Sequence, residues 1–396
     1  MQSRLAKNPV KHLFLLIGTN PLPNYVAAKL LADSETHIYL VHSSGPNGTY
    51  PVATRLIEVL KLEEGSCTKV PVDEANPYSI YKQIRKYVDG KKGLGLNYTG
   101  GTKVMAVHAY QAIADSATDV AYSYLDARCL ELVSHDDKRN FKREYVGDSV
   151  KITIKDLARM HGIPLVTYSQ KPIQVDLCKA IAKLQCSGEE KRNSWREWIK
   201  KDKCKNLPAG DVFIDVLAAM QRVCGDSPLT EETLAQNLGY KSLPSLQKWF
   251  KAEWLENYAF HCVLQLIESA KLDDLSDYGI NLECKGYANN TINELKFETD
   301  VVFILGYQLF IISCIDSGEK SECKKHLFEA YVRARQIGGD ESRVCLVSGY
   351  DKPEDLQKEV EKSWDVPGMI RVMGIKHWPD LSSYIGDWVK TARRKG

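Results

Sequence analysis

The N-terminal third of the chain alternates continuous apolar runs with segments whose apolar residues recur at helical spacing. The expected strands and helices alternate at 12–18, 24–33, 37–44, 51–65, 91–100 and 102–116, and a hairpin or paired edge follows at 120–126 and 127–134. Strands separated by single helices form parallel sheets with right-handed crossovers. We therefore predict an α/β domain built on a Rossmann-like parallel sheet.

The C-terminal part follows a different order of patterns. It predicts a helix at 252–269, antiparallel strands at 281–288, 294–305 and 307–315, a helix at 321–339, strands at 342–349 and 369–375, and a last helix. This order is typical of an α/β, restriction-endonuclease-like core. The stretch between the two parts is mostly helical in pattern. We therefore expect three domains, at 1–150, 151–250 and 251–396.

A helix–turn–helix rhythm occupies residues 229–250 of the helical stretch. Thr230 would cap the first helix, Gly239 would lie at the turn, and a second helix would begin near Ser242. Contact with DNA is one interpretation of this pattern. The second helix has no cluster of Arg, Asn and Gln, which favours a linker or dimerisation role.

Three polar loops follow the carboxyl ends of the predicted parallel strands. They contain Gly18, Thr19 and Asn20; Ser43 and Ser44; and Asn97, Thr99, Gly100, Gly101, Thr102 and Lys103. In open parallel sheets ligands bind beyond the carboxyl ends of the strands. The predicted topology therefore gathers these loops into one candidate ligand site.

The third of these loops, in the stretch LNYTGGTKVMAVHAY, runs from a strand into the start of a helix. Free backbone amides at a helix N-terminus favour an anion such as phosphate, and Lys103 adds a positive charge. The loop is not a P-loop, and no Gly-x-Gly-x-x-Gly follows the first strand, which argues against a dinucleotide cofactor. A tight turn capped by Thr102 is the alternative interpretation.

Composition narrows the class of protein. The net charge of +2 is too small to attract nucleic acid to the protein as a whole, so anion binding must come from local sites. No apolar run approaches membrane-spanning length, and residues 1–12 do not form a secretory signal. The 11 cysteines are never spaced Cys-x-x-Cys, which favours reduced thiols in a cytoplasmic protein over disulfides or a zinc ribbon.

Candidate acids lie on the second predicted strand of the C-terminal part. Glu298 and Asp300 share one strand face, because side chains alternate with period two. Asp300 directly precedes a wholly apolar run, where an idle carboxylate is costly. Glu298 could instead face solvent, and Glu294 is a weaker substitute for it.

The motifs GTN after the first strand, NYTGGTKVM after a later one and YSYLD at 122–126 resemble the CRISPR-associated Rossmann-fold (CARF) sensor family. The resemblance covers about residues 1–165, and the loop from Asn97 to Lys103 aligns without a gap. It implies that a homodimer binds a cyclic oligoadenylate across its axis, with cyclic tetra-adenylate as the expected ring. A symmetric ring suits an isologous dimer.

The C-terminal part resembles the PD-(D/E)xK nuclease domains that are fused to such sensors, on the residues AEWLENY at 252–258 and ETDVV at 298–302. The resemblance implies Mn²⁺ or Mg²⁺ at Glu298 and Asp300, with Glu256 supporting the metal site or its water network. Clustered carboxylates hold divalent ions that polarise a phosphodiester and activate water. RNA, DNA or both would be the substrate.

The chain departs from this family pattern on the next strand. Where the family has Glu-x-Lys, this chain has Ser313 and Ile315. Either catalysis has been lost, or the lysine has migrated to the following helix as Lys324 or Lys325, which we favour. Asp316 could supply a replacement acid. Arg333 and Arg335 could contact a nucleic-acid backbone or the helix dipole.

The resulting hypothesis is a cyclic-oligoadenylate-activated, metal-dependent endonuclease of type III CRISPR antiviral defence, in which the helical middle transmits closure of the sensor. The alternative is a cyclic-oligoadenylate-responsive transcription regulator that uses residues 229–250 on DNA and carries a dead nuclease remnant. A sensor that slowly degrades its own ring is a third interpretation, although the loop has no evident general base.

Overall fold

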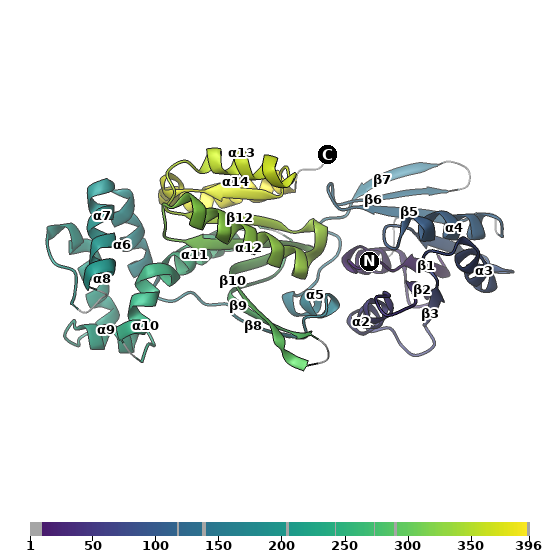
Figure 1. The fold of residues 1–396 in the computed structure, drawn as a ribbon, viewed down its shortest axis with the longest axis horizontal. Coiled ribbons are helices and arrows are strands. Elements are labelled where there is room, and N and C mark those ends of the chain that lie inside the picture. The colour runs from purple at the N-terminus through teal and green to yellow at the C-terminus, as the bar shows by residue number, and fades with distance from the viewer. Residues whose placement is uncertain are drawn as a thin grey trace.

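The computed structural model describes residues 10–116, 119–136, 140–202, 206–241, 243–272, 274–288 and 291–393. Figure 1 shows an elongated arrangement: one sheet with its helices at one end, a second α/β layer in the middle, and a group of helices at the other end. None of the described helices is long and apolar enough to cross a membrane. None of the described cysteines forms a disulfide.

The first sheet is mostly parallel, as predicted. Its strands are β1 (His12–Leu16), β2 (His37–Ser43), β3 (Cys67–Val72), β4 (Leu94–Asn97), β5 (Ala121–Asp126), β6 (Glu131–Asp136) and β7 (Phe141–Tyr145). The strand order is β3-β2-β1-β4-β5-β6-β7. The pairs from β3 to β5 are parallel, and β6 and β7 add an antiparallel edge.

Helices cover this sheet. They are α1 (Leu22–Leu31), α2 (Tyr50–Leu60), α3 (Pro77–Val88) and α4 (Lys103–Ala114). Neither β3 nor α3 was predicted from the sequence pattern. Strand β3 is an edge strand whose polar residues and Pro71 weaken the apolar pattern, and half-exposed edge strands tolerate such residues.

The second sheet has the strand order β13-β12-β11-β10-β9-β8. Its strands are β8 (Leu165–Ser169), β9 (Leu275–Ala288), β10 (Thr291–Leu305), β11 (Gln308–Ile315), β12 (Arg343–Ser348) and β13 (Ile370–Met373). The predicted meander of β9, β10 and β11 is antiparallel, as expected. Strand β8 lies in the stretch expected to be helical, and it pairs with β9.

Two layers of helices enclose the second sheet. They are α11 (Trp254–Glu268) and α14 (Leu381–Ala392) on one side, and α12 (Lys320–Gly338) and α13 (Pro353–Trp364) on the other. Along β10, Val301 and Phe303 pack in the core with α11, whereas Val302 and Ile304 pack in the core with α12. This two-sided burial explains the continuous apolar run of β10.

The remaining helices require a correction to the expected signal path. They are α5 (Ile154–Met160), α6 (Val175–Cys186), α7 (Glu189–Glu197), α8 (Ile214–Cys224), α9 (Glu231–Asn237) and α10 (Leu243–Lys248). Helices α6 to α10 lie at the end of the molecule that is farthest from the first sheet (Figure 1). Of the helical stretch that was expected to relay closure, α5 packs between the two sheets, whereas α6 to α10 do not stand between them.

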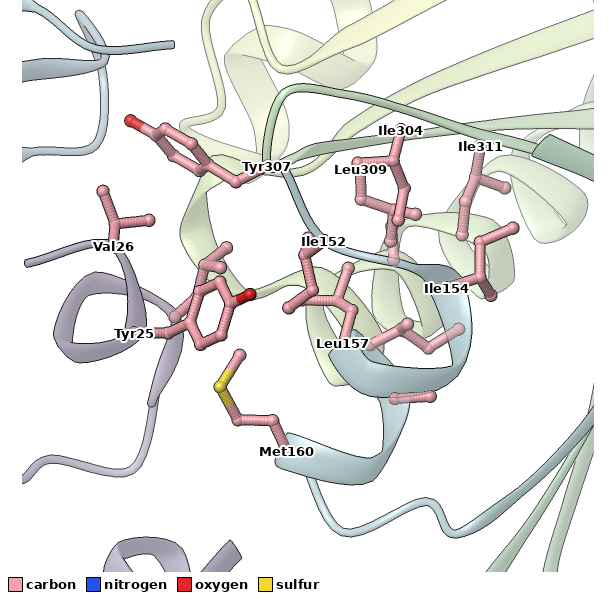
Figure 2. Packing of buried hydrophobic residues seen from close by; sticks show 14 of the residues in the cluster. Tyr25, Val26, Ile152, Ile154, Leu157, Met160, Ile304, Tyr307, Leu309 and Ile311 are labelled. Atoms are coloured by element: carbon pink, nitrogen blue, oxygen red, sulfur yellow. The ribbon is translucent and has the colours of Figure 1, made fainter. Parts of the chain in front are cut away.

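The two α/β layers instead contact each other directly. One hydrophobic core runs from α1 through α5 to the second sheet (Figure 2). The labelled side chains in this core are Tyr25, Val26, Ile152, Ile154, Leu157, Met160, Ile304, Tyr307, Leu309 and Ile311. Because buried apolar contacts are continuous across the boundary, the two layers are mechanically joined.

Candidate functional site

The loops after β1 and β4 are packed against each other at the carboxyl edge of the first sheet. A Cβ atom on Gly18 would lie 3.1 Å from the backbone nitrogen of Gly101, and one on Gly100 would lie 2.2 Å from the carbonyl oxygen of Leu16. Gly101 has a φ of +74°. These contacts require glycine, so the loops that topology was expected to gather do meet.

The start of α4 is built as the sequence predicts. The Thr102 hydroxyl accepts a hydrogen bond from the backbone N–H of Met105 at 3.1 Å and so caps the helix. Lys103 is the first helical residue and is exposed. The loop therefore presents backbone amides and the exposed cation of Lys103 at a helix N-terminus, which suits an anionic ligand.

Asn97 and Thr99 use their side chains inside the domain. The Asn97 amide donates to the Ser123 hydroxyl at 3.1 Å, and its oxygen accepts from the Thr99 N–H at 3.3 Å. The Thr99 hydroxyl accepts from the Leu125 N–H at 2.7 Å. Both residues therefore shape the loop by joining it to β5.

Ser43 and Ser44 have a similar structural role. Ser43 is buried, and it exchanges two hydrogen bonds with Thr49: the Ser43 N–H donates at 3.0 Å and the Thr49 N–H donates at 2.9 Å. The Thr49 hydroxyl also donates to the Ile17 carbonyl at 3.0 Å. Ser44 donates to Val72 at 3.0 Å. Thr49, which the sequence analysis missed, thus ties the loops after β1 and β2 together.

In the loop after β1, Gly18 and the exposed Thr19 lie at the edge of the sheet. Asn20 lies differently, because its amide contacts the second α/β layer. The Asn20 amide donates to the carboxylate of Glu341 at 3.2 Å, and its oxygen lies 3.3 Å from Nε2 of His161. Asn20 is therefore a contact between layers as well as part of the ligand loop.

A second candidate site is a cleft of about 370 Å³ between β10, β11 and α12. It is lined by Lys296, Phe297, Glu298, Thr299, Asp300, Ile311, Ser313, His326, Glu329, Ala330 and Arg333. The cleft therefore brings the predicted acids Glu298 and Asp300 together. It does not include Lys324 or Lys325 among its described lining residues.

Asp300 is held by the neighbouring strand. Its carboxylate accepts a hydrogen bond from the Cys314 N–H at 2.6 Å and one from the Ser313 hydroxyl at 3.3 Å. Burial raises the pKa of Asp300 above its usual range, although these two hydrogen bonds lower it. The nearby charges of Glu298 and Glu329 raise the pKa further. A bound cation would relieve this crowding of negative charge.

Glu256 lies on α11 beside this group of acids. Burial raises the pKa of Glu256 well above the usual value for a glutamate, and the charges of Asp300 and Glu253 add to the effect. Glu256 therefore belongs to the same electrostatic cluster as Asp300. It is not among the described residues that line the cleft itself.

The donor set suits a hard divalent cation in part. Among the described residues, no group of three or more His, Cys, Asp or Glu side chains is arranged to hold a metal ion. Mg²⁺ is nevertheless often held by one or two carboxylates, with water and substrate phosphate as the other ligands. Glu298 and Asp300, in one solvent-open cleft, fit that arrangement.

Lys324, one of the two lysines expected to have migrated, pairs outside the cleft, which corrects the prediction for this residue. Lys324 forms an ion pair with Glu359 of α13, and Lys320 pairs with the same carboxylate at 2.5 Å. Lys325 is exposed. Helix α12 therefore points Lys324 toward α13 rather than toward Asp300. Asp316 also turns away, since it accepts a hydrogen bond from Gln185 of α6 at 2.7 Å.

Other basic groups occupy the cleft. Lys296 lies two residues before Glu298 and pairs with it at 3.7 Å. His326 and Arg333 project from α12, and burial lowers the pKa of His326. The Arg333 guanidinium lies over the Phe297 ring at 4.6 Å. Two sequence patterns could have identified these basic residues. Lys296 shares a strand face with Glu298 and Asp300, and residues 326, 329, 330 and 333 share one helix face.

Arg335 and Arg333 lie at different places in the structure. It forms an ion pair with Asp340 beyond the C-terminal end of α12. Only Arg333 of this pair lines the cleft with the acids. A contact with a nucleic-acid backbone was one prediction for both arginines. At this cleft, the position of Arg333 allows such a contact and that of Arg335 does not.

Two family models match the chain. The Card1 CARF domain matches residues 13–156, and the Card1-like endonuclease domain matches residues 245–392. The chain is a fusion of a CARF domain and a Card1-like endonuclease domain. The loops after β1, β2 and β4 thus belong to the CARF domain, and the cleft between β10, β11 and α12 belongs to the endonuclease domain.

Solved structures share the whole architecture. Protein VC1899 from Vibrio cholerae superposes with a TM-score of 0.70 at 17% identity, covering 97% of this chain and 99% of that one. Can2 from Sulfobacillus thermosulfidooxidans, solved with cyclic tetra-adenylate, gives a TM-score of 0.68 at 16% identity, covering 98% of each chain. No curated protein sequence matches the chain significantly. At these identities, the structures show a common fold.

Proposed function

We propose that the protein is a nuclease that is activated by a cyclic oligoadenylate. The observation that carries this proposal is the presence, in one chain, of a CARF ligand edge and of a cleft in which Asp300 and Glu298 meet basic side chains. Cyclic tetra-adenylate is the expected activator, because Can2, which has the same fold, was solved with that ring. The proposed role is in type III CRISPR defence in the cytoplasm.

A homodimer would complete the ring site. Helix α4 starts at the ligand loop and exposes an apolar stripe of Val104, Val107 and Tyr110, with 37%, 60% and 39% of each residue exposed. A second copy that covers this stripe would bring two Lys103 side chains and two sets of backbone amides toward one ring. Equivalent loops around a two-fold axis match a ligand that is itself symmetric.

In the endonuclease domain, Glu298 and Asp300 would hold Mn²⁺ or Mg²⁺, and Glu256 would support them. When bound, the metal supplies charge stabilisation at the phosphate and a water with a lowered pKa. Lys296 and Arg333 can orient the phosphodiester of RNA or DNA by charge and hydrogen bonding. His326, which its lowered pKa keeps neutral at pH 7, can accept a proton in the cleft.

The test is one set of incubations of the full-length protein with cyclic tetra- or hexa-adenylate, with Mn²⁺, Mg²⁺ or EDTA, and with labelled RNA and supercoiled plasmid. We expect cutting that requires both the ring and the metal. The reactions identify the ring and the substrate together. Cutting without a ring would contradict gating, and ring binding without cutting under any condition would contradict the nuclease.

Substitution of Lys103 tests the ligand site. We expect Lys103→Ala to weaken binding of cyclic tetra-adenylate about ten-fold or more, since a charge-assisted hydrogen bond contributes about 1.5–3 kcal/mol. Isothermal titration calorimetry measures the affinity. Lys86→Ala, an exposed lysine of α3 that contacts Gln83, is the matched control. Equal affinities of the two variants would show that the loop is only a turn.

A cyclic-oligoadenylate-responsive transcription regulator is the second candidate. Ser313 and Ile315 favour it, because they stand where the family pattern has a glutamate and a lysine. The hairpin of α9 and α10 would then contact DNA. Its buried Leu234 and Leu246 share a core with α6, α8 and α11, so the hairpin is also part of the helical group. Ring-dependent retardation of duplex DNA without cutting would favour this function.

A further inference from the structure

Asn20 makes a polar contact between the CARF ligand loop and the endonuclease domain. It lies two residues after Gly18, in the loop after β1. Its amide donates to the Glu341 carboxylate at 3.2 Å, and its oxygen accepts from the Leu22 N–H at 3.1 Å. A side chain held at both ends cannot move with the loop unless Glu341 follows or the hydrogen bond breaks.

Glu341 is anchored on its own side of the boundary. It is fully buried, and its backbone carbonyl accepts hydrogen bonds from the Gln308 amide at 3.0 Å and the Arg343 guanidinium at 2.9 Å. One of its carboxylate oxygens is buried without a hydrogen-bond partner in the described structure. Because a buried carboxylate needs donors, the hydrogen bond from Asn20 is valuable to this position.

His161, at the end of α5, is the third member of this contact. Its Nδ1 lies 3.0 Å from the Leu157 carbonyl and its Nε2 lies 3.3 Å from the Asn20 oxygen. Burial lowers the pKa of His161 to about 4, so the ring is neutral and carries a single N–H. Both ring nitrogens face acceptors. The ring can therefore satisfy only one of them, which makes two hydrogen-bonding arrangements available.

The contact ends on the helix that lines the nuclease cleft. Gly339 follows the last residue of α12 and has a φ of +66°. A Cβ on Gly339 would lie 2.5 Å from the Asn20 amide nitrogen, so the loop and the helix end are in van der Waals contact. The same helix carries His326 and Arg333 into the cleft. A shift at its C-terminal end is passed along a rigid helix to those side chains.

We infer that Asn20 is a positioning residue that couples the CARF ligand loop to the cleft side chains of α12 through Glu341 and Gly339. The inference rests on the proposed function in that the loop after β1 is taken to respond to the ring. Ring binding at Gly18 and Thr19 shifts Asn20, its contacts with Glu341 and with His161 change, and α12 moves relative to β10. This direct route does not pass through helices α6 to α10.

The test compares Asn20→Asp with the unaltered full-length protein. Aspartate keeps the size of the side chain and the acceptor for Leu22, removes the donor to Glu341 and places a second carboxyl group against it. Hydrogen exchange of the peptides covering 326–341 is followed by mass spectrometry, with and without cyclic tetra-adenylate. Without a ring, we expect exchange there to rise by at least about five-fold, the factor for the loss of one hydrogen bond.

Further variants separate coupling from simple destabilisation. In Glu341→Gln the side-chain oxygen still accepts from Asn20, so exchange should stay as in the unaltered protein, whereas Glu341→Ala should match Asn20→Asp. Arg393→Gln removes a different set of contacts, to the Gly147 carbonyl at 3.2 Å across the boundary and to Asp274 and the Leu305 carbonyl within the endonuclease domain. It should leave the response of α12 to the ring unchanged, because none of these contacts involves Asn20 or Glu341. In the unaltered protein the ring should change exchange along 326–341, and in Asn20→Asp that response should be lost.

The outcomes decide the inference separately from the proposed function. If the ring binds and α12 responds equally in Asn20→Asp, the inference is overturned while the gated nuclease stands. If the unaltered protein binds no ring, the proposed function fails. The ring-free comparison then decides: unchanged exchange at 326–341 in Asn20→Asp and Glu341→Ala overturns the coupling, and raised exchange in both supports it.

Discussion

Single side chains explain why the cleft can be a metal site although the family pattern is incomplete. Two hydrogen bonds from β11 orient Asp300, and Ser313, which replaces the expected glutamate, supplies one of them. The missing lysine has counterparts in Lys296 and Arg333, which reach the cleft from β10 and α12. Charge at the site is therefore retained, but on different elements.

Asp300→Asn is expected to reduce ring-activated cleavage by at least about 100-fold, because even changes outside the metal ligands cost about 10- to 100-fold. Affinity for the ring should not change. Single-turnover cleavage at saturating ring measures the effect. Lys324→Ala is the contrasting variant: its side chain pairs with Glu359, so cleavage should stay within about two-fold. If Lys324→Ala lost cleavage and Asp300→Asn kept it, Lys324 rather than Asp300 would be the catalytic side chain.

Binding of Mn²⁺ should strengthen as the pH rises. Burial raises the pKa of both Asp300 and Glu256, so these carboxyls keep their protons to a higher pH than usual, and a metal must displace those protons. We expect the increase in Tm caused by Mn²⁺ to grow between about pH 5.5 and pH 8. Asp300→Asn should abolish that growth. An increase that is independent of pH would place the metal elsewhere.

Without metal, the same carboxyls should make stability fall as the pH rises. The raised pKa values mean that the folded state binds more protons than the unfolded state in this range. The sign is therefore the opposite of that for an ion-paired aspartate. Differential scanning fluorimetry without metal, in parallel with the Mn²⁺ series, checks this baseline.

Among the secondary-structure elements, the strand-to-helix connections of the CARF domain depend on close backbone approach. Gly100 leaves no room for a side chain beside the Leu16 carbonyl. Helix α12 depends on a different feature, because its apolar face packs on the second sheet while its polar face lines the cleft. The same helix therefore contributes to stability and to the candidate chemistry.

Gly100→Ala should destabilise the protein by about 1–3 kcal/mol, the usual cost of forcing a group into a filled space, and should weaken ring binding. Denaturant unfolding and calorimetry measure the two effects. Gly318→Ala is the matched control, because the nearest atom to its added Cβ would be at 3.4 Å. Equal stability of the two variants would show that the loops after β1 and β4 are free to separate.

Across the domains, the shared core indicates that the CARF and endonuclease domains fold together. Helix α5 lies between them, and Leu157 of α5 is fully buried in that core (Figure 2). The two domains are in direct contact through α5 and Asn20. Helices α6 to α10 therefore lie outside the shortest route between the ligand loops and the nuclease cleft.

Leu157→Ala should reduce stability by about 2–5 kcal/mol. A single calorimetric transition should move as a whole, since the core it weakens belongs to both domains. Leu165→Ala, at a residue that is 46% exposed, should change stability by less than about 0.5 kcal/mol. Two transitions, of which only one moves in Leu157→Ala, would contradict the shared core.

Much of the fold was predictable because its information is local. Apolar runs, helix caps such as Thr102 and turn glycines such as Gly239 depend on neighbouring residues, and they correctly placed the parallel sheet, the meander and α12. Strands β3 and β8 were missed because short, half-exposed strands have weak patterns. Their place is set by pairing with β2 and β9, which are distant in sequence.

The sequence by itself determined which chemical groups are available: a strand-to-helix loop suited to anions, and paired carboxylates at Glu298 and Asp300 on one strand face. Their partners depended on the three-dimensional fold. The direction of Lys324 toward Glu359, the entry of Lys296 and Arg333 into the cleft and the meeting of Asn20 with Glu341 each join residues on different elements. Such contacts follow from packing, because side chains far apart in the chain meet only when helices and strands dock.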